Sequence, residues 1–276
     1  VVAHHPHAPR GRADQSQREP DEGGLAGAVR AEEAEALARL DAQVDANHAD
    51  GAPVHPGERR GFDRVPHSDQ STDRMPLHVT HESNWGLGWI APEPAHMRRA
   101  SHALAADGGV WLLDPVDLPG LDERLARLGP VRGVVQLLDR HPRDCAALAA
   151  RHGAPLLVTP REGVPGSPFE AVTVVWRRWW REVALWWPER RVLAVPEALG
   201  TAAYFRAPGR PLGVHPMLRL APPRALGRFE PEWLLPGHGG PLGGPATASA
   251  VREAIAGARR EIPRWLAGLP RASRRR

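Results

Sequence analysis

From about residue 75 onward, apolar residues fall into short runs and helical spacings that predict strands alternating with helices. The run Gly133–Leu138 is almost continuously apolar, which is typical of a strand buried on both faces. The next segment, Cys145–Arg151, has helical spacing and ends at Gly153, a residue type that commonly closes helices. Leu121–Leu128 also predicts a helix, with two acidic residues in its first turn, where the helix dipole favours negative charge.

The remaining patterns predict further strands and one more helix. A strand or loop edge is expected at Trp85–Trp89, and strands are expected at Val110–Leu113, Pro155–Val158, Val172–Trp176, Glu182–Trp187 and Arg191–Val195. A helical turn is expected at Pro231–Leu234, and a helix at Thr247–Leu266, capped by Thr247 or Ser249. Alternating elements, then a run of strands, then a helix favour two packed sheets flanked by helices over a doubly wound sheet.

Residues 1–74 differ in composition from the rest of the chain. They are rich in His, Pro, Gly, Asp and Arg and poor in aromatic and β-branched residues. Such a segment buries too little apolar surface to offset its ordering entropy, so we expect a largely disordered or non-native N-terminal extension with at most one isolated helix. The globular domain is expected over 75–267, followed by a basic tail at 268–276.

The composition of the chain indicates the cellular compartment that we expect for the protein. The chain contains no lysine, so all 36 basic residues are arginine, and the formal net charge is only +4. The single cysteine excludes an internal disulfide framework, which fits a reducing compartment. There is no apolar run long enough to span a bilayer and no signal-peptide pattern at the N-terminus, so we expect a cytoplasmic protein without membrane contact.

One loop carries the clearest chemical signal. The six residues after the strand Gly133–Leu138 and Asp139 read Arg-His-Pro-Arg-Asp-Cys, from Arg140 to Cys145. This stretch resembles the H-x-H-x-D-H metal-binding loop of the metallo-β-lactamase-fold hydrolases with half of its ligands replaced.

Three more segments resemble that family, in its order, between Arg98 and Leu242. Residues 101–104 with 109–115 are similar to the opening hairpin, which ends in v-x-L-I-D-x-G. Residues 182–199 are similar to S-V-A-L-Y-L-P-E-R-R-V-L-F-T-G-D-A-L, and residues 234–239 to L-x-P-G-H-G. The resemblance, which covers about half the chain, implies an αββα sandwich of metallo-β-lactamase type.

The resemblance implies which metal positions survive. The first metal's positions correspond to Arg140, Pro142 and, by looser alignment, Arg178, none of which can ligate a cation. The second metal's positions hold four residues that zinc accepts, so the resemblance implies one zinc ion or none, bound by Asp144, Cys145, Glu197 and His238.

Each of these four residues also has a structural explanation. Asp144 precedes a helix and suits an N-cap, and Cys145 suits a small buried position. Glu197 follows a proline in a loop, where it can be solvated, and His238 lies in a Pro-Gly-His-Gly turn. The sequence therefore leaves open whether a metal binds or whether the pocket is inactive.

Arginine at the lost positions suggests electrostatic functions. Arg140 can stabilise a developing oxyanion, which places it with Asp144 as a candidate catalytic residue. Arg178 and His215 are candidate substrate-binding residues, since a guanidinium binds carboxylate or phosphate groups bidentately. A simpler alternative is that Arg140 pairs with Asp144 or Glu197 and fills the vacant site with an ion pair.

Tryptophan is concentrated in the two central predicted strands of the second half. Trp176, Trp179 and Trp180 alternate with arginines, and Trp186 and Trp187 follow on the next strand. This pattern is typical of a core or a homodimer interface, of a ligand pocket or, less often, of a single-stranded nucleic-acid binder.

Three functions remain open from the sequence. The first is a mononuclear zinc-dependent hydrolase of an ester, thioester or lactam-like bond acting on a small-molecule substrate. The second is a catalytically silent family member that binds a ligand or a protein. The third, a nucleic-acid binder, is the least favoured.

Overall fold

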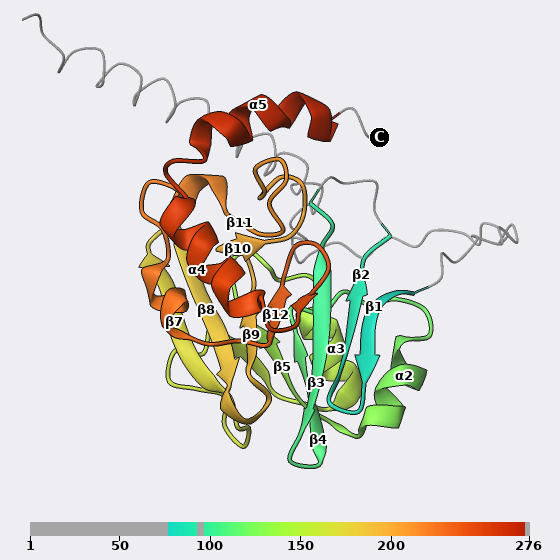
Figure 1. Ribbon diagram of the computed structural model, residues 1–276. Coiled ribbons are helices and arrows are strands. Elements are labelled where there is room, and N and C mark those ends of the chain that lie inside the picture. The colour runs from blue at the N-terminus through green and yellow to red at the C-terminus, as the bar shows by residue number, and fades with distance from the viewer. Residues whose placement is uncertain (1–76, 93–96, 274–276) are drawn as a thin grey trace, which may run out of the picture. The chain divides into compact units, whose positions relative to one another are not determined.

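The computed structural model describes residues 77–92 and 97–273, and the N-terminal extension expected at 1–74 lies outside them. Two β-sheets face each other (Figure 1). The first sheet has the order β1-β2-β3-β4-β5-β6, and its strands are His78–Ser83, Gly86–Ile90, Ala100–Ala106, Gly109–Leu113, Val131–Gln136 and Leu156–Val158. The second has the order β13-β12-β9-β8-β7, with strands Leu242–Gly243, Trp233–Pro236, Val192–Val195, Trp180–Trp187 and Glu170–Arg177.

Helices cover the outer face of each sheet. Helices α2 (Leu121–Leu128) and α3 (Cys145–His152) pack on the first sheet, and α4 (Thr247–Gly257) packs on the second (Figure 1). Strands β10 (Leu199–Gly200) and β11 (Gly213–Val214) form a separate two-stranded sheet. Helix α5 (Ile262–Ser273) follows α4 in the chain. The described part of the chain is therefore an αββα sandwich, as the sequence predicts.

The buried side chains follow the alternation of the strands. Val134 points into the core beneath α2 and α3, whereas Val135 points into the core between the two sheets. Strand β5 lies between β4 and β6 in a parallel arrangement, which accounts for its apolar character on both faces. This confirms the buried strand expected at Gly133–Leu138.

Two local predictions were wrong. The helical turn expected at Pro231–Leu234 is replaced by strand β12, which pairs in parallel with β9, so tertiary pairing overrides local preference. The helix expected over Thr247–Leu266 is divided after Gly257, and a second helix begins at Ile262. Pro263 lacks a backbone N–H and suits the first turn of a helix, which favours a new start there.

The expected helix caps also differ from the observed contacts. The hydroxyls of Thr247 and Ser249 donate hydrogen bonds to the carbonyl oxygens of Glu232 and Ala246, so neither caps α4. Asp144 does precede α3, but its carboxylate accepts the backbone N–H of Asp117 at 2.8 Å. Helix α5 extends into the segment expected to be a basic tail.

Candidate metal centre

Four side chains meet where the strands of both sheets end. Asp114 follows β4 and His141 lies in the loop after β5, while Glu197 follows β9 and His238 follows β12. Strands β4 and β5 run parallel, and so do β9 and β12, so the carboxyl ends of each pair lie at one edge of its sheet. The sandwich brings these two edges together.

Three of these side chains form a compact group. The His141 Nε2 atom lies 2.8 Å from Glu197 Oε2, the His238 Nε2 atom lies 3.3 Å from the same oxygen, and the two Nε2 atoms are 3.4 Å apart. In a tetrahedral zinc site with bonds of about 2.0–2.1 Å, ligand atoms lie about 3.3 Å from one another. Two of the three separations match this value and the third is shorter, so one cation can contact all three atoms.

The hydrogen bonds of the two imidazoles direct their Nε2 atoms toward this point. His141 Nδ1 donates to the Asp114 carboxylate at 3.2 Å, and His238 Nδ1 donates to the carbonyl oxygen of Met97 at 3.1 Å. Metal-binding histidines usually donate their second N–H to a carboxylate or a backbone carbonyl, which fixes the tautomer and the ring orientation. The donor set of two imidazoles and one glutamate is also one that catalytic zinc sites use. The residues present therefore fit a zinc ion.

A third histidine orients the glutamate. His215 Nδ1 accepts the backbone N–H of Met217, so its Nε2 carries the proton and faces Glu197 Oε1 at 3.3 Å. This contact holds one carboxylate oxygen and leaves Oε2 to face the other two imidazoles. His215 is thus placed at the centre, where it positions Glu197.

The charges of this buried group depend on one another. Burial lowers the pKa of His141, but the hydrogen bonds to Asp114 and Glu197 outweigh burial and raise the pKa overall. Burial alone would raise the pKa of Glu197, yet the imidazoles of His238 and His141 hold it well below its usual range. The pKa of His238 is lowered, chiefly by burial. Without a metal, the neighbouring carboxylates therefore favour the charged form of His141, whereas burial disfavours the charged form of His238.

The partly buried side chain of Arg143 lies beside the centre. Arg143 Nη1 donates to the carbonyl oxygens of Ala100 and Asp114, at 2.5 and 2.8 Å, and Arg143 Nη2 donates to that of Gly237 at 3.1 Å. Burial lowers its pKa, while the neighbouring Asp114 raises it. Arginine remains protonated in proteins, so Arg143 supplies a fixed positive charge and ties three segments of the chain together.

The structure brings together only two of the four ligands expected from the sequence. Glu197 and His238 belong to the group, and in the described part of the chain their third companion is His141. Asp144 instead holds the amide of Asp117, and Cys145 packs beneath α2 and α3, where burial raises the pKa of its thiol to about 12. Packed in this core, the thiol lies outside the group formed by His141, Glu197 and His238.

The two arginines at the replaced positions lie near the start of strand β8. The guanidinium of Arg140 stacks over the indole of Trp180, 4.4 Å from the ring centroid. Arg178 is exposed in the turn between β7 and β8. The fixed charge that contacts Asp114 and the loop before His238 is therefore Arg143, which the sequence did not single out.

His141 escaped the sequence prediction because it occupies a non-ligand position of the family loop. A signal was nevertheless present, since His141 is the only imidazole in the six-residue loop and imidazole is a favoured zinc ligand. Asp114 was likewise not predicted as a site residue, because the sequence placed it only at the end of a strand.

The tryptophan-rich strands are partly core and partly surface. Trp180 is fully buried, whereas Trp176 and Trp179 are exposed beside arginines. A homodimer through these strands stays a prediction. In the described ranges, every helix is too short or too polar to cross a membrane.

Comparisons with known proteins give structural likeness only. Neither a family model nor a curated protein matches the sequence. Among solved structures, a metallo-β-lactamase from Pontibacter korlensis is 14% identical, with a TM-score of 0.46 over 66% of this chain and 99% of that one. DIM-1 metallo-β-lactamase exposed to ceftazidime is 13% identical, with a TM-score of 0.44 over 71% of this chain and 100% of that one. The peroxy diiron species of the chemotaxis sensor ODP is 12% identical, with a TM-score of 0.43 over 66% of this chain and 94% of that one.

The assignment of fold follows from the chain itself. Two facing sheets carry helices on their outer faces, and two of the predicted ligands, Glu197 and His238, lie at strand ends. The described part of the chain is an αββα sandwich of the type that the sequence motifs imply.

Proposed function

We propose that the chain binds one zinc ion through His141, Glu197 and His238 and uses it to hydrolyse an ester, thioester or lactam-like bond. The observation that carries the proposal is the pre-set orientation of the two imidazoles. Each donates Nδ1–H to a fixed acceptor, and both turn Nε2 toward one carboxylate oxygen.

Zinc in such a site supplies Lewis-acid activation of water and of a carbonyl group. The protein's own residues supply orientation and charge. Asp114 fixes the His141 ring, and His215 fixes Glu197. Arg140 remains the candidate for stabilising a developing oxyanion, since its guanidinium is held over Trp180 near His215.

The first test is metal content together with hydrolysis. The full chain, purified without a His tag or chelator, is expected to contain about one zinc per molecule and to bind it through three protein ligands. A panel of ester, thioester and β-lactam substrates should reveal an activity that is lost in His238→Ala and after zinc removal. A protein that binds no zinc at neutral pH would contradict the proposal.

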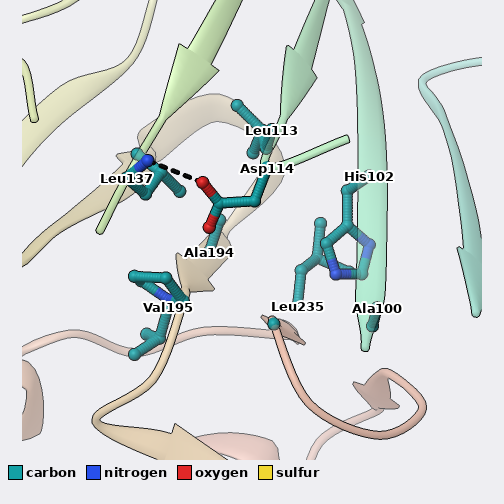
Figure 2. A pocket seen from close by; sticks show the side chains of 10 residues that line it. Ala100, His102, Leu113, Asp114, Leu137, Ala194, Val195 and Leu235 are labelled. Atoms are coloured by element: carbon teal, nitrogen blue, oxygen red, sulfur yellow. Dashed lines mark hydrogen bonds between the residues drawn. The ribbon is translucent and has the colours of Figure 1, made fainter. Parts of the chain in front are cut away.

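A second candidate function is a silent ligand- or protein-binding member of the fold. The ligand residues are only 8%, 6% and 2% exposed, for His141, Glu197 and His238. The cavity beside them has a volume of about 10 Å³, which is room for one water molecule. In Figure 2, Asp114 and His102 approach this cavity from different strands, and Asp114 accepts the amide of Leu137 at 2.8 Å.

Charge balance also favours this second candidate. The raised pKa of His141 and the positive charge of Arg143 both favour compensation of the charges of Asp114 and Glu197 without any metal. Metal analysis separates the two candidates, because the silent protein should contain no stoichiometric zinc and no hydrolytic activity.

The affinity for zinc is expected to rise with pH. A zinc ion can bind His141 only after the proton on Nε2 leaves, and the carboxylates raise the pKa of this ring above its ordinary value of 6.5. Below that raised pKa, affinity should increase by about tenfold per pH unit, and above it the affinity should level off. Chelator competition between pH 5.5 and 9 measures this, and a profile that is flat across the range would contradict proton competition at His141.

A further inference from the structure

The start of β8 lies between two loops: the loop after β5, which carries His141, and the loop after β9, which carries Glu197. Val183 N–H donates to the carbonyl oxygen of Leu137 at 2.9 Å, and Asp139 N–H donates to that of Arg181 at 3.1 Å, so Glu182 faces Leu138 in an antiparallel bridge. His141 N–H in turn donates to Leu138 O at 3.0 Å. The backbone around Glu182 therefore holds the loop of the first sheet that presents His141.

The side chain of Glu182 holds the other loop. Its Oε1 atom accepts the backbone N–H groups of Glu197 and Ala198, at 3.2 and 2.8 Å. Its Oε2 atom accepts the indole N–H of Trp180 at 2.7 Å. The residue is completely buried, so each of these three donors depends on it for a partner.

Trp180 connects the same carboxylate to the rest of the centre. Its indole packs edge-on against His215, with ring centroids 5.0 Å apart, and His215 Nε2 faces Glu197 Oε1. Glu182 thus supports Glu197 by two routes, through the backbone amides and through Trp180 and His215.

We propose that Glu182 is a positioning residue that sets the separation between His141 and Glu197. Its backbone fixes the loop from the first sheet, and its carboxylate fixes the loop from the second sheet. A single residue therefore sets the position of His141 relative to Glu197. The expected effect of Glu182 on zinc affinity rests on the proposed function. Its effect on the distance between His141 and Glu197 does not require a bound metal.

The chemistry of the site requires a carboxylate. Three N–H donors converge on two oxygens and favour the ionised carboxylate, which offers only acceptors, while burial opposes them and raises the pKa of Glu182 to about 7. Glutamine has nearly the same shape, but its amide group would direct N–H against an N–H, either at Trp180 or at the two backbone amides. At least one buried donor would be left without a partner, and the loop would have to move to relieve this.

The test is Glu182→Gln, with Glu170→Gln as the matched control on the exposed face of the adjacent strand β7. We expect Glu182→Gln to weaken zinc binding by about 10- to 100-fold, as substitutions beside a metal ligand commonly do, and to change the visible spectrum of the cobalt-loaded protein. The control should remain within about twofold of the wild type. Affinity and cobalt spectrum both unchanged in Glu182→Gln would overturn the proposal.

Two additions keep the test decisive. If Glu182→Gln does not fold, Trp180→Phe/Glu182→Met, which removes the indole donor together with the carboxylate, is compared with Trp180→Phe alone. The same weakening is expected, because the amides of Glu197 and Ala198 lose their acceptor. If the wild type binds no zinc, the proposed function fails, and crystal structures of the metal-free proteins decide the positioning. The wild-type contact between His141 Nε2 and Glu197 Oε2 is 2.8 Å, and in Glu182→Gln it should exceed about 3.5 Å, the limit of a hydrogen bond. An unchanged contact would overturn the proposal.

Discussion

Replacing His141 with alanine is expected to weaken zinc binding by more than about 100-fold, beyond the usual effect of substitutions that only support a ligand. His141 supplies one of three ligand atoms, and its ring is the one held by Asp114. Isothermal titration or chelator competition on the folded protein measures this loss. Asp114→Asn should produce a smaller loss of about 10- to 100-fold, because it alters the orientation and basicity of the ring but leaves the ligand in place.

The matched control for this prediction is Cys145→Ala. Cys145 occupies a ligand position in the family loop, but here its thiol is packed in the core beneath α2 and α3. Its thiol reaches the backbone carbonyl oxygen of His141, at 3.8 Å, and lies outside the group of ligand atoms, so its removal should leave zinc affinity within about threefold. Strong loss of zinc in Cys145→Ala, with little loss in His141→Ala, would show that the metal binds at the positions expected from the sequence.

Replacing Arg143 with methionine is expected to lower the free energy of unfolding by about 3–5 kcal/mol. The substitution removes the donors to the carbonyl oxygens of Ala100, Asp114 and Gly237, which belong to three separate segments. It also removes the positive charge that lies near Asp114 and Glu197. Urea denaturation followed by circular dichroism measures the change.

The control for Arg143 is Arg252→Met in α4. Arg252 pairs with Glu230 at the surface, where both side chains are well exposed, so its loss should change stability by less than about 1 kcal/mol. Equal effects of the two substitutions would mean that the contacts of Arg143 add little to the stability of the fold.

Much of the local structure could be predicted because it depends on neighbouring residues. The buried strand at Gly133–Leu138 and the helix closed by Gly153 follow from apolar runs, spacing and a residue that tolerates a left-handed backbone. Strand β12 could not be predicted in this way. Its pairing with β9 joins segments that lie far apart in the chain, and the local sequence carries no record of that partner.

The residues of the candidate site also differ in how far the sequence could predict them. Glu197 and His238 were identifiable because each lies in a motif that the fold uses after a strand. Asp144 and Cys145 were expected beside them, but the first residues of α3 turn one side chain to the Asp117 amide and the other into the core. His141 takes their place because the turn before α3 directs its ring toward Glu197.

The sequence by itself determined the buried strand β5, the helices α2 and α3, the resemblance to the metallo-β-lactamase family and the loops that carry polar groups. These depend on periodicity and on turn residues, which act over a few positions. Only the tertiary structure decided which polar groups meet. His141, Glu197 and Glu182 come from three loops and strands in two sheets, and their separations are set by sheet packing and by long-range hydrogen bonds. A change of one residue in such a register turns a side chain from the site into the core, and this is why the ligand set could be read only in three dimensions.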